Sequence, residues 1–438
     1  MEELAGYRGS ALSFLRKART KVGDILELSA EWGKVTGALV PRYEYDDDSH
    51  VVLKLPSGYN VGLEVSKLKS ARVKAKGEKP SFKPPPAPRS RARLPRVLIL
   101  GTGGTIASRV DYRTGAVRPA VSAGELYALI PELSEIAKVE PEILFSIYSE
   151  NMEPSHWSKL ARRVARAVGE GFAGVVITLG TDTLGYTAAA LSFALVGVPI
   201  PVVLTAAQRS SDRPSSDAAT NLIGAVSVAA RAVFSGVYVA MHMNDSDSEI
   251  AIHRGTRVRK NHTSARAAFE SVGTPLAGVW RDGAVQNADD SLPPRGKRTP
   301  FKPRLRFEGR VALLKFYPSM PKLLIDTLRR AGIRAIVLEG SGLGHVNSRN
   351  IAAVRSCVSK GRLVFMTSQC VRGRVDMRVY ETGRDLLAAG AIPLEDMLAE
   401  TALVKAMWAL GNSKNAAEAR QMMTRNLAGE MTLRTLPK

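Results

Sequence analysis

Cysteine and long apolar stretches are scarce in this 438-residue sequence, and each shortage excludes a class of protein. The two cysteines, Cys357 and Cys370, are too few for a disulfide framework, which indicates a reduced, cytoplasmic compartment. Near the N-terminus the apolar run at residues 11–15 is short, so we expect neither a signal peptide nor a membrane-spanning segment. The apolar run at residues 174–179 is bounded by glycine and threonine, and we interpret it as a buried strand.

Positive charge is abundant and unevenly placed. The formal net charge is +21, and residues 67–96 alone hold eleven Lys/Arg against one acid, a net charge of +10. Such an excess favours a nucleic acid or another anionic partner. Prolines throughout residues 80–95 prevent a regular helix or central strand, so we interpret the run from about residue 67 to residue 95 as a semi-rigid linker. It is either a solvated tether or a tether that also contacts RNA phosphate.

The N-terminal part predicts a small β-barrel domain at residues 1–75, followed by the linker at residues 76–95. Turn signals separate four short apolar runs near residues 24–28, 34–40, 50–55 and 59–64. This part contains no cluster of nucleophile and base, which favours a binding module.

From residue 96 the pattern predicts an α/β fold with parallel sheets covered by helices. Apolar strands at residues 97–100, 174–179, 201–205 and 237–241 alternate with helical segments, which predicts a first domain at residues 96–290. The polar stretch at residues 281–304 is interpreted as a second linker, which we bound at residues 291–305. Strands at residues 311–316, 335–338 and 363–367 predict a smaller α/β domain at residues 306–438.

Two turns rich in glycine and threonine follow buried strands of the first domain. One turn occupies residues 101–108 and the other residues 180–184, and the carboxyl ends of strands are where ligands bind in open α/β sheets. A dinucleotide fingerprint does not fit, because Ile106 occupies its third glycine position. Each turn alone also has a purely structural explanation. The first can be a tight connection between a strand and a helix, and in the second Thr181 or Asp182 can cap a helix.

Hydrolysis of an amide by a hydroxyl group needs a nucleophile, a base and donors for the oxyanion. None of the six histidines lies beside the two turns, so a lysine oriented by a carboxylate is the alternative base. Lys260 is a candidate, although Arg257, Arg259 and Lys260 together also fit a charged surface loop.

The two turns together resemble the signature motifs of the bacterial-type L-asparaginase family. The resemblance covers residues 96–429 and implies an asparaginase-like two-domain α/β core. It implies that Thr105 is the nucleophile and that Thr181, Asp182 and Lys260 complete the catalytic set. Tyr112 resembles the family tyrosine that supports Thr105 when its loop closes.

The segment around Ser149 and Glu150 matches the position where that family binds the α-amino and α-carboxylate groups of the substrate. Asparaginases usually have glutamine where this chain has Glu150, and a carboxylate suits the substrate ammonium. A glycine-rich strand end at residues 339–345 resembles the segment that approaches a neighbouring protomer's site, although for His345 itself we favour an ordinary loop histidine. His253 and His262 lack metal-ligand spacing, so we predict no catalytic metal.

The small β domain and Glu150 make the chain similar to one branch of this family, the D subunits of the archaeal-type glutamyl-tRNA(Gln) amidotransferases. That resemblance implies hydrolysis of L-glutamine and delivery of ammonia to a partner subunit of the E type, which amidates Glu-tRNA(Gln). It implies that ATP and Mg²⁺ are used by the partner, that this chain has no cofactor, and that a homodimer sits within a heterotetramer. The alternatives are a stand-alone cytoplasmic L-asparaginase and a nonenzymatic RNA-binding protein on an inactive scaffold.

Overall fold

The structure is a computed structural model. The residues it describes are 4, 6–42, 47–56, 60–77, 94–103, 108–110, 117–119, 126–127, 130–209, 216–296 and 301–435. In the part of the chain it describes, no helix is long and apolar enough to cross a membrane.

The N-terminal part forms a helix and one antiparallel sheet. Its elements are α1 (Gly9–Lys17), β1 (Ile25–Ala30), β2 (Gly33–Leu39), β3 (His50–Lys54), β4 (Asn60–Glu64) and β5 (Leu68–Ala75), with the strands in the order β4-β3-β2-β1-β5. Alternate residues such as Leu26 and Leu28 point inward and pack against Leu15 of α1. The four predicted strands and the small β domain are confirmed, and closure into a barrel stays a prediction.

Strand β5 was not predicted, because it lies in the basic run interpreted as a linker. The linker interpretation is wrong for Leu68–Ala75, which pairs with β1, but β5 is an edge strand and so agrees with the expectation of no central strand there. Leu68, Ala71 and Val73 pack on the domain core, while Lys69 and Arg72 between them are exposed, as edge strands allow. Most of the predicted linker at residues 76–95 lies outside the described residues.

The central lobe is built on an eight-stranded sheet. Its order is β17-β16-β13-β12-β11-β10-β6-β9, from β6 (Arg96–Gly101), β9 (Lys138–Ile143), β10 (Gly174–Thr178), β11 (Pro201–Thr205), β12 (Gly236–His242), β13 (Glu249–Arg254), β16 (Gly278–Arg281) and β17 (Ala284–Asn287). The five strands from β12 to β9 are parallel, which confirms that prediction, and the other three are antiparallel. Residues 284–287, expected in a linker, form the edge strand β17.

Helices cover both faces of this sheet. Leu98 and Leu100 of β6 face one core with α4 (Pro154–Gly169) and α5 (Leu184–Ala194). The alternate residues Val97 and Ile99 face a second core with α3 (Leu133–Ile136) and α6 (Ala218–Arg231). The sheet is therefore the middle layer of three.

The C-terminal lobe has a parallel sheet of its own. Its strands run in the order β18 (Val311–Lys315), β19 (Ala335–Gly340), β20 (Leu363–Ser368), β21 (Ile392–Pro393). Its helices are α7 (Leu323–Arg330), α8 (Ser348–Ser359), α9 (Glu381–Ala388), α10 (Ala399–Asn412) and α11 (Ala416–Thr424). Helix α10 packs on α5 of the central lobe, where Phe193 stacks on Trp408 with ring centroids 5.7 Å apart. One apolar core therefore runs through both lobes.

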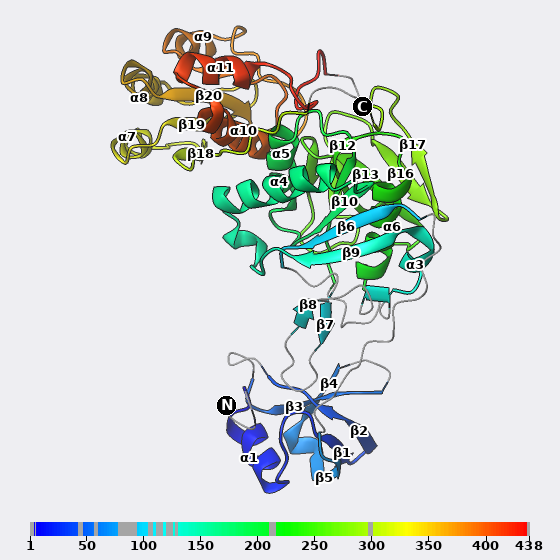
Figure 1. The fold of residues 1–438 in the computed structure, drawn as a ribbon. Coiled ribbons are helices and arrows are strands. Elements are labelled where there is room, and N and C mark those ends of the chain that lie inside the picture. The colour runs from blue at the N-terminus through cyan, green and yellow to red at the C-terminus, as the bar shows by residue number, and fades with distance from the viewer. Residues whose placement is uncertain are drawn as a thin grey trace.

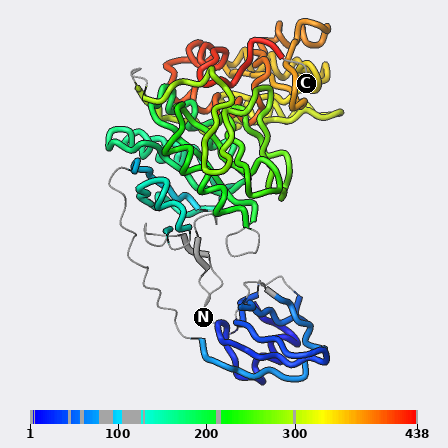
Figure 2. Tube along the Cα trace, turned by 90° about the vertical axis from the view of Figure 1, so that its right-hand side faces the viewer, coloured from blue at the N-terminus to red at the C-terminus, as the bar shows by residue number. Residues whose placement is uncertain are grey.

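The two views of the chain place the N-terminal sheet at the opposite end of the molecule from the β18–β21 sheet (Figures 1 and 2). Between them, the short hairpin of β7 (Ser108–Val110) and β8 (Val117–Pro119) projects from the central lobe on the side of the N-terminal sheet (Figure 1).

Candidate functional site

The two glycine and threonine turns predicted from the sequence lie side by side. Strands β6 and β10 are parallel neighbours, with Gly101 opposite Thr178 at their carboxyl ends. Beyond them, the backbone N–H and the hydroxyl of Thr102 both donate to the carbonyl of Thr178, each at 3.0 Å. Both turns thus begin at the same edge of the sheet, where ligands bind in open α/β folds.

Lys260 meets the second turn. Its Nζ lies 2.9 Å from the hydroxyl oxygen of Thr181 and 2.7 Å from Oδ1 of Asp182. The lysine side chain is 16% exposed and that of Asp182 is 69% exposed, so the two side chains sit at the mouth of the site. The alternative interpretation, that Thr181 or Asp182 caps the following helix, is wrong, because the N-cap of α5 is Thr183 and no side chain caps its N-terminus.

Ser149 lies against the same turn. It is buried at the start of a short 3-10 helix, η2 (Ser149–Asn151), and its carbonyl accepts a 2.7 Å hydrogen bond from the hydroxyl of Thr183. A Cβ added to Gly180 would lie 2.7 Å from the Ser149 hydroxyl, so only glycine allows this approach. The predicted substrate-binding serine is therefore brought to the predicted catalytic residues, with exposed Glu150 beside it.

The loop of the predicted nucleophile starts at the same place. Gly103 has φ of +124°, and a Cβ there would lie 2.0 Å from the carbonyl oxygen of Ile147. The backbone N–H of Ile147 in turn donates to the carbonyl of Thr102 at 3.1 Å. Thr105 and Tyr112 lie outside the described residues, so their roles stay predictions.

Lys260 belongs to a strand outside the main sheet. The strand is β14 (Val258–Lys260), which pairs with β15 (Phe269–Ser271). Just before it, the guanidinium of Arg257 is fully buried and donates to Oδ2 and to the carbonyl of Asp396, at 2.6 and 2.8 Å. Arg259 forms an ion pair with Glu400 of α10 at 3.3 Å. The interpretation of residues 257–260 as a charged surface loop is therefore wrong, because both arginines bind the C-terminal lobe.

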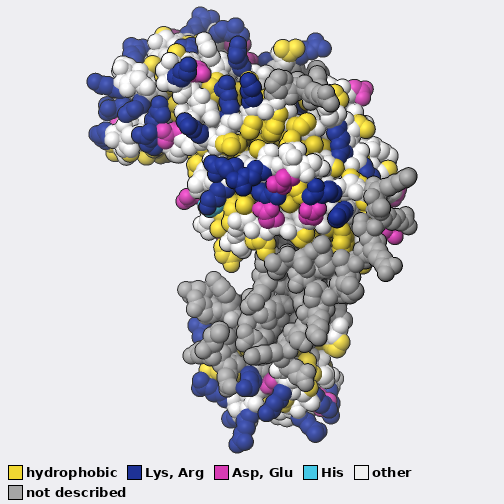
Figure 3. Space-filling view, viewed as in Figure 1, with side chains coloured by type: hydrophobic (Ala, Val, Ile, Leu, Met, Phe, Trp, Pro, Cys, Tyr) yellow, Lys and Arg dark blue, Asp and Glu magenta, His cyan; other side chains and the backbone are white. Residues whose placement is uncertain are grey.

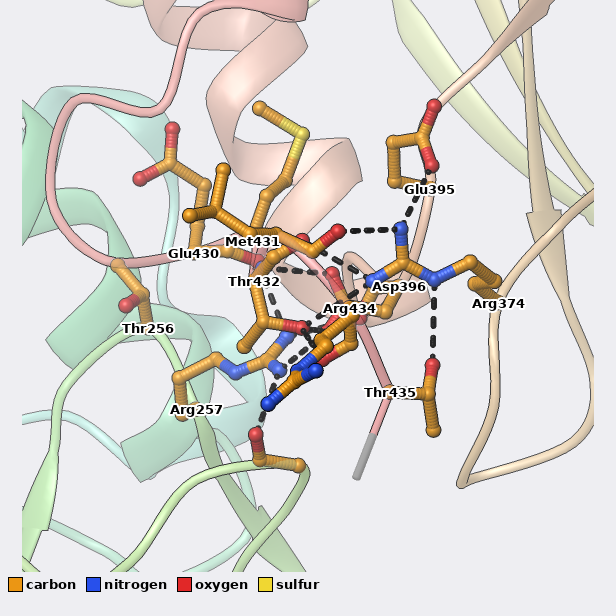
Figure 4. A network of polar contacts seen from close by, with 12 residues as sticks. Thr256, Arg257, Arg374, Glu395, Asp396, Glu430, Met431, Thr432, Arg434 and Thr435 are labelled. Carbon is orange, nitrogen blue, oxygen red and sulfur yellow. Dashed lines mark hydrogen bonds and ion pairs between the residues drawn. The ribbon is translucent and has the colours of Figure 1, made fainter. Parts of the chain in front are cut away.

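The anchoring contacts of Arg257 extend into the C-terminal segment at residues 427–435 (Figure 4). Burial opposes ionisation of Asp396, but hydrogen bonds from Thr432 and the positive charge of Arg257 outweigh it and lower the pKa of that carboxyl. Arg257 also donates to the carbonyl of Glu430 at 3.1 Å. Sequence reasoning missed this network, since Asp396 is 139 residues away from Arg257 in the chain and no motif marks it.

The glycine-rich end of β19 also has partners within its own lobe. Nδ1 of His345 lies 3.2 Å from the hydroxyl of Thr382, and its ring packs edge-on against Tyr380, with centroids 5.5 Å apart. Contact of this segment with a substrate stays a prediction.

Family models match three successive parts of the chain. Residues 20–73 match the GatD N-terminal domain, residues 96–292 match the N-terminal domain of asparaginase, and residues 310–423 match the glutaminase/asparaginase C-terminal domain. Two glutamyl-tRNA(Gln) amidotransferase D subunits are similar over nearly the full length. The one from Metallosphaera sedula is 47% identical, covering 98% of this chain and 96% of its own. The one from Pyrococcus furiosus is 48% identical, covering 97% and 98%.

Solved L-asparaginases resemble the two larger lobes. The thermostable enzyme from Thermococcus kodakarensis superposes with a TM-score of 0.69 at 35% identity, covering 77% of this chain and 99% of its own. L-asparaginase I from Vibrio cholerae has a TM-score of 0.68 at 27% identity, covering 78% and 100%. The asparaginase-like α/β core predicted from the sequence is thereby confirmed.

Proposed function

The chain belongs to the family of glutamyl-tRNA(Gln) amidotransferase D subunits, and we propose that it is the glutaminase subunit of such an enzyme. In this proposal it hydrolyses L-glutamine and supplies ammonia to a partner subunit, which converts Glu-tRNA(Gln) to Gln-tRNA(Gln). The observation that carries the proposal is the contact of Lys260 with both Thr181 and Asp182. Ser149 lies next to them and accepts a hydrogen bond from Thr183.

In the proposed reaction the hydroxyl oxygen of Thr105 attacks the side-chain amide carbon of glutamine. Its proton passes through Thr181 to the neutral amine of Lys260, which Asp182 orients. The same proton then returns to the amide nitrogen as the carbon–nitrogen bond breaks, and the nitrogen leaves as ammonia. The product is an ester between Thr105 and the glutamyl group. Water then attacks this ester, which releases glutamate and restores the hydroxyl.

Ser149 and Glu150 are proposed to hold the α-carboxylate and the α-ammonium of glutamine. The buried Ser149 hydroxyl is a donor for the carboxylate, and the exposed Glu150 carboxylate complements the ammonium. Tyr112 is proposed to cover Thr105 when glutamine is bound.

The finer assembly is also proposed. The partner subunit is of the E type and uses ATP and Mg²⁺, so that this chain needs no cofactor and no metal. Two copies of this chain form a homodimer within a cytoplasmic heterotetramer. The N-terminal β domain supports the complex over a free enzyme, because the L-asparaginase from Thermococcus kodakarensis matches only 77% of this chain.

The second candidate is a stand-alone L-asparaginase, which the likeness of the two larger lobes to solved asparaginases favours. Ammonia release from glutamine and from asparagine, each with and without the partner subunit and Glu-tRNA(Gln), separates the two. We expect glutamine hydrolysis that rises when partner and tRNA are present. Fast asparagine hydrolysis that does not depend on the partner subunit or on the tRNA would establish the second candidate instead.

The proposed residue roles are tested in the same assay. Thr105→Ala should abolish hydrolysis and Lys260→Ala should lower kcat by about 10³-fold, since a general base contributes about 10²–10⁴-fold. Lys138→Ala, which removes an exposed lysine from β9, is the matched control and should keep wild-type activity. Wild-type turnover in either site variant would refute the mechanism.

A further inference from the structure

The net positive charge of the chain is confined to two stretches. The first stretch is residues 67–96, with a net charge of +10. The second is residues 304–378, which hold fifteen Lys/Arg against four Asp/Glu, a net charge of +11. The rest of the chain is therefore neutral as a whole. The second stretch is not a tether, because it begins in the segment between the two lobes and continues through the C-terminal sheet.

An open groove of about 750 Å³ lies at the start of this second stretch. It runs between α4, the segment at residues 303–308 and the end of α10, and three arginines line it, Arg162, Arg304 and Arg306. The one acid of its lining, Glu308, is neutralised by Arg310 at 2.8 Å and Arg334 at 3.2 Å. The hydrogen bonds and charge of Arg310 lower the pKa of Glu308 to about 2.

The segment along the groove presents its cations at a regular spacing. Lys302, Arg304 and Arg306 are exposed, while the alternate residues Leu305 and Phe307 pack against the core of the lobes. Two residues of extended chain span about 6.6 Å, so the three cationic side chains leave the backbone at similar intervals.

Hydrogen bonds to neighbouring helices fix the backbone of this row. The backbone N–H of Arg304 donates to the carbonyl of Ala194 at 2.9 Å, and the indole N–H of Trp408 donates to the carbonyl of Arg304 at 2.9 Å. The side-chain amide of Asn412 donates to the carbonyl of Arg306 at 2.7 Å. The row is therefore held in place before any ligand binds, which lowers the entropy cost of binding.

Helix α4 supplies a second row, in which Arg162 lines the groove and the other two cations flank it on the helix. Lys159, Arg162 and Arg166 are exposed at positions i, i+3 and i+7, which lie on one face of a helix. Within the described part of the chain, none of them has an acidic partner within 4.0 Å, whereas Arg163 is bound by Glu142. In Figure 3, dark-blue side chains gather over α4 and over the C-terminal lobe on the same face of the molecule.

We propose that this groove binds the phosphate backbone of the tRNA that the complex amidates. The proposal rests on the proposed function and assigns the tRNA a contact surface on this chain. Two rows of exposed cations match a polyanion with regularly repeated charges. Arginines and lysines, rather than exposed aromatic rings, are the side chains that the two rows present, which favours backbone contacts over base contacts.

The test uses the complete complex with its partner subunit and Glu-tRNA(Gln). The variant Arg162→Gln/Lys302→Gln/Arg306→Gln removes three charges from the two rows. Its matched control is Arg349→Gln/Arg355→Gln/Lys360→Gln, which removes three exposed charges from α8 and the residue after it.

We expect the groove variant to bind tRNA about tenfold more weakly at physiological salt, with the slope of log K against log salt reduced by about 2 to 3. The KM for tRNA in amidation should rise, while glutamine hydrolysis without tRNA stays at the wild-type rate. The control variant should change tRNA affinity by less than about twofold. Thermal unfolding verifies the fold of each variant, and Lys302→Gln alone, which alters one exposed side chain, should lower the slope by about 1.

Three results would overturn the proposal. Unchanged tRNA affinity in the groove variant would show that the groove does not contact tRNA. An equal loss of tRNA affinity in the control variant would show that only the net charge of the chain matters. A groove variant that no longer copurifies with the partner subunit makes the groove a protein interface instead. Failure of the proposed function itself is separate, because then the wild-type complex would neither bind nor amidate tRNA.

Discussion

The buried ion pair between Lys405 and Glu430 should be the most costly single contact to break in the C-terminal lobe. Both side chains are 0% exposed, and Nζ of Lys405 lies 2.5 Å from the Glu430 carboxylate and 2.8 Å from the carbonyl of Met423. Burial lowers the pKa of Lys405, and Glu430 opposes this shift. Lys405→Met fits a side chain of similar length but leaves Glu430 buried without a counter-charge. The expected cost is about 3–5 kcal/mol, the range for removing one partner of a buried pair.

Calorimetry measures this cost as a fall in the melting temperature. For a lobe of this size each kcal/mol corresponds to roughly 2–4 °C, so Lys405→Met should lower the melting temperature by about 10 °C. The double variant Lys405→Met/Glu430→Gln should be more stable than the sum of its single changes predicts, because no buried charge is left unpaired. A single variant that melts within about 2 °C of wild type, or strictly additive losses, would refute the reasoning.

Three further variants test the site and its surroundings. Gly180→Ala places a methyl group 2.7 Å from the Ser149 hydroxyl, so the KM for glutamine should rise about tenfold with a smaller change in kcat, as steady-state kinetics would measure. Gly103→Ala adds a Cβ 2.0 Å from the carbonyl of Ile147 at φ of +124°, which should destabilise the protein by at least about 1–3 kcal/mol in urea unfolding and reduce turnover. Burial lowers the pKa of His253 from 6.5 to about 4. Between these values the unfolded chain binds a proton that the folded protein does not, so wild type should lose about 2 kcal/mol from pH 7 to pH 5, whereas His253→Asn should lose less.

The parallel strands and the two turns of the site were predictable because their signals are local. Strands β10 and β11 are fully buried, so they appear in the sequence as continuous apolar runs ended by glycine or threonine. The polar residues after them had to lie at the carboxyl edge of a parallel sheet. Pairing of Gly101 with Thr178 brings the two turns together as expected.

Edge strands were harder to predict, for a physical reason. Strands β5 and β17 each pair on one side only, and their outward faces are polar or charged. Their apolar content is therefore low, and composition alone resembles that of a linker. The partner strand that stabilises each of them is supplied by the fold and leaves no mark in the local sequence.

The alternation of side chains along β14 explains why Lys260 needed a family resemblance to be singled out. Successive residues of a strand point to opposite sides. Arg257 and Arg259 face the C-terminal lobe, where they bind Asp396 and Glu400, and the same alternation directs Lys260 to the turn at Thr181. Anchoring and chemistry thus use alternate positions along β14 and the residue before it, and all three cations look alike in the sequence. Their roles separate only through partners far along the chain, so the C-terminal lobe fixes the position of the lysine on which the proposed hydrolysis depends.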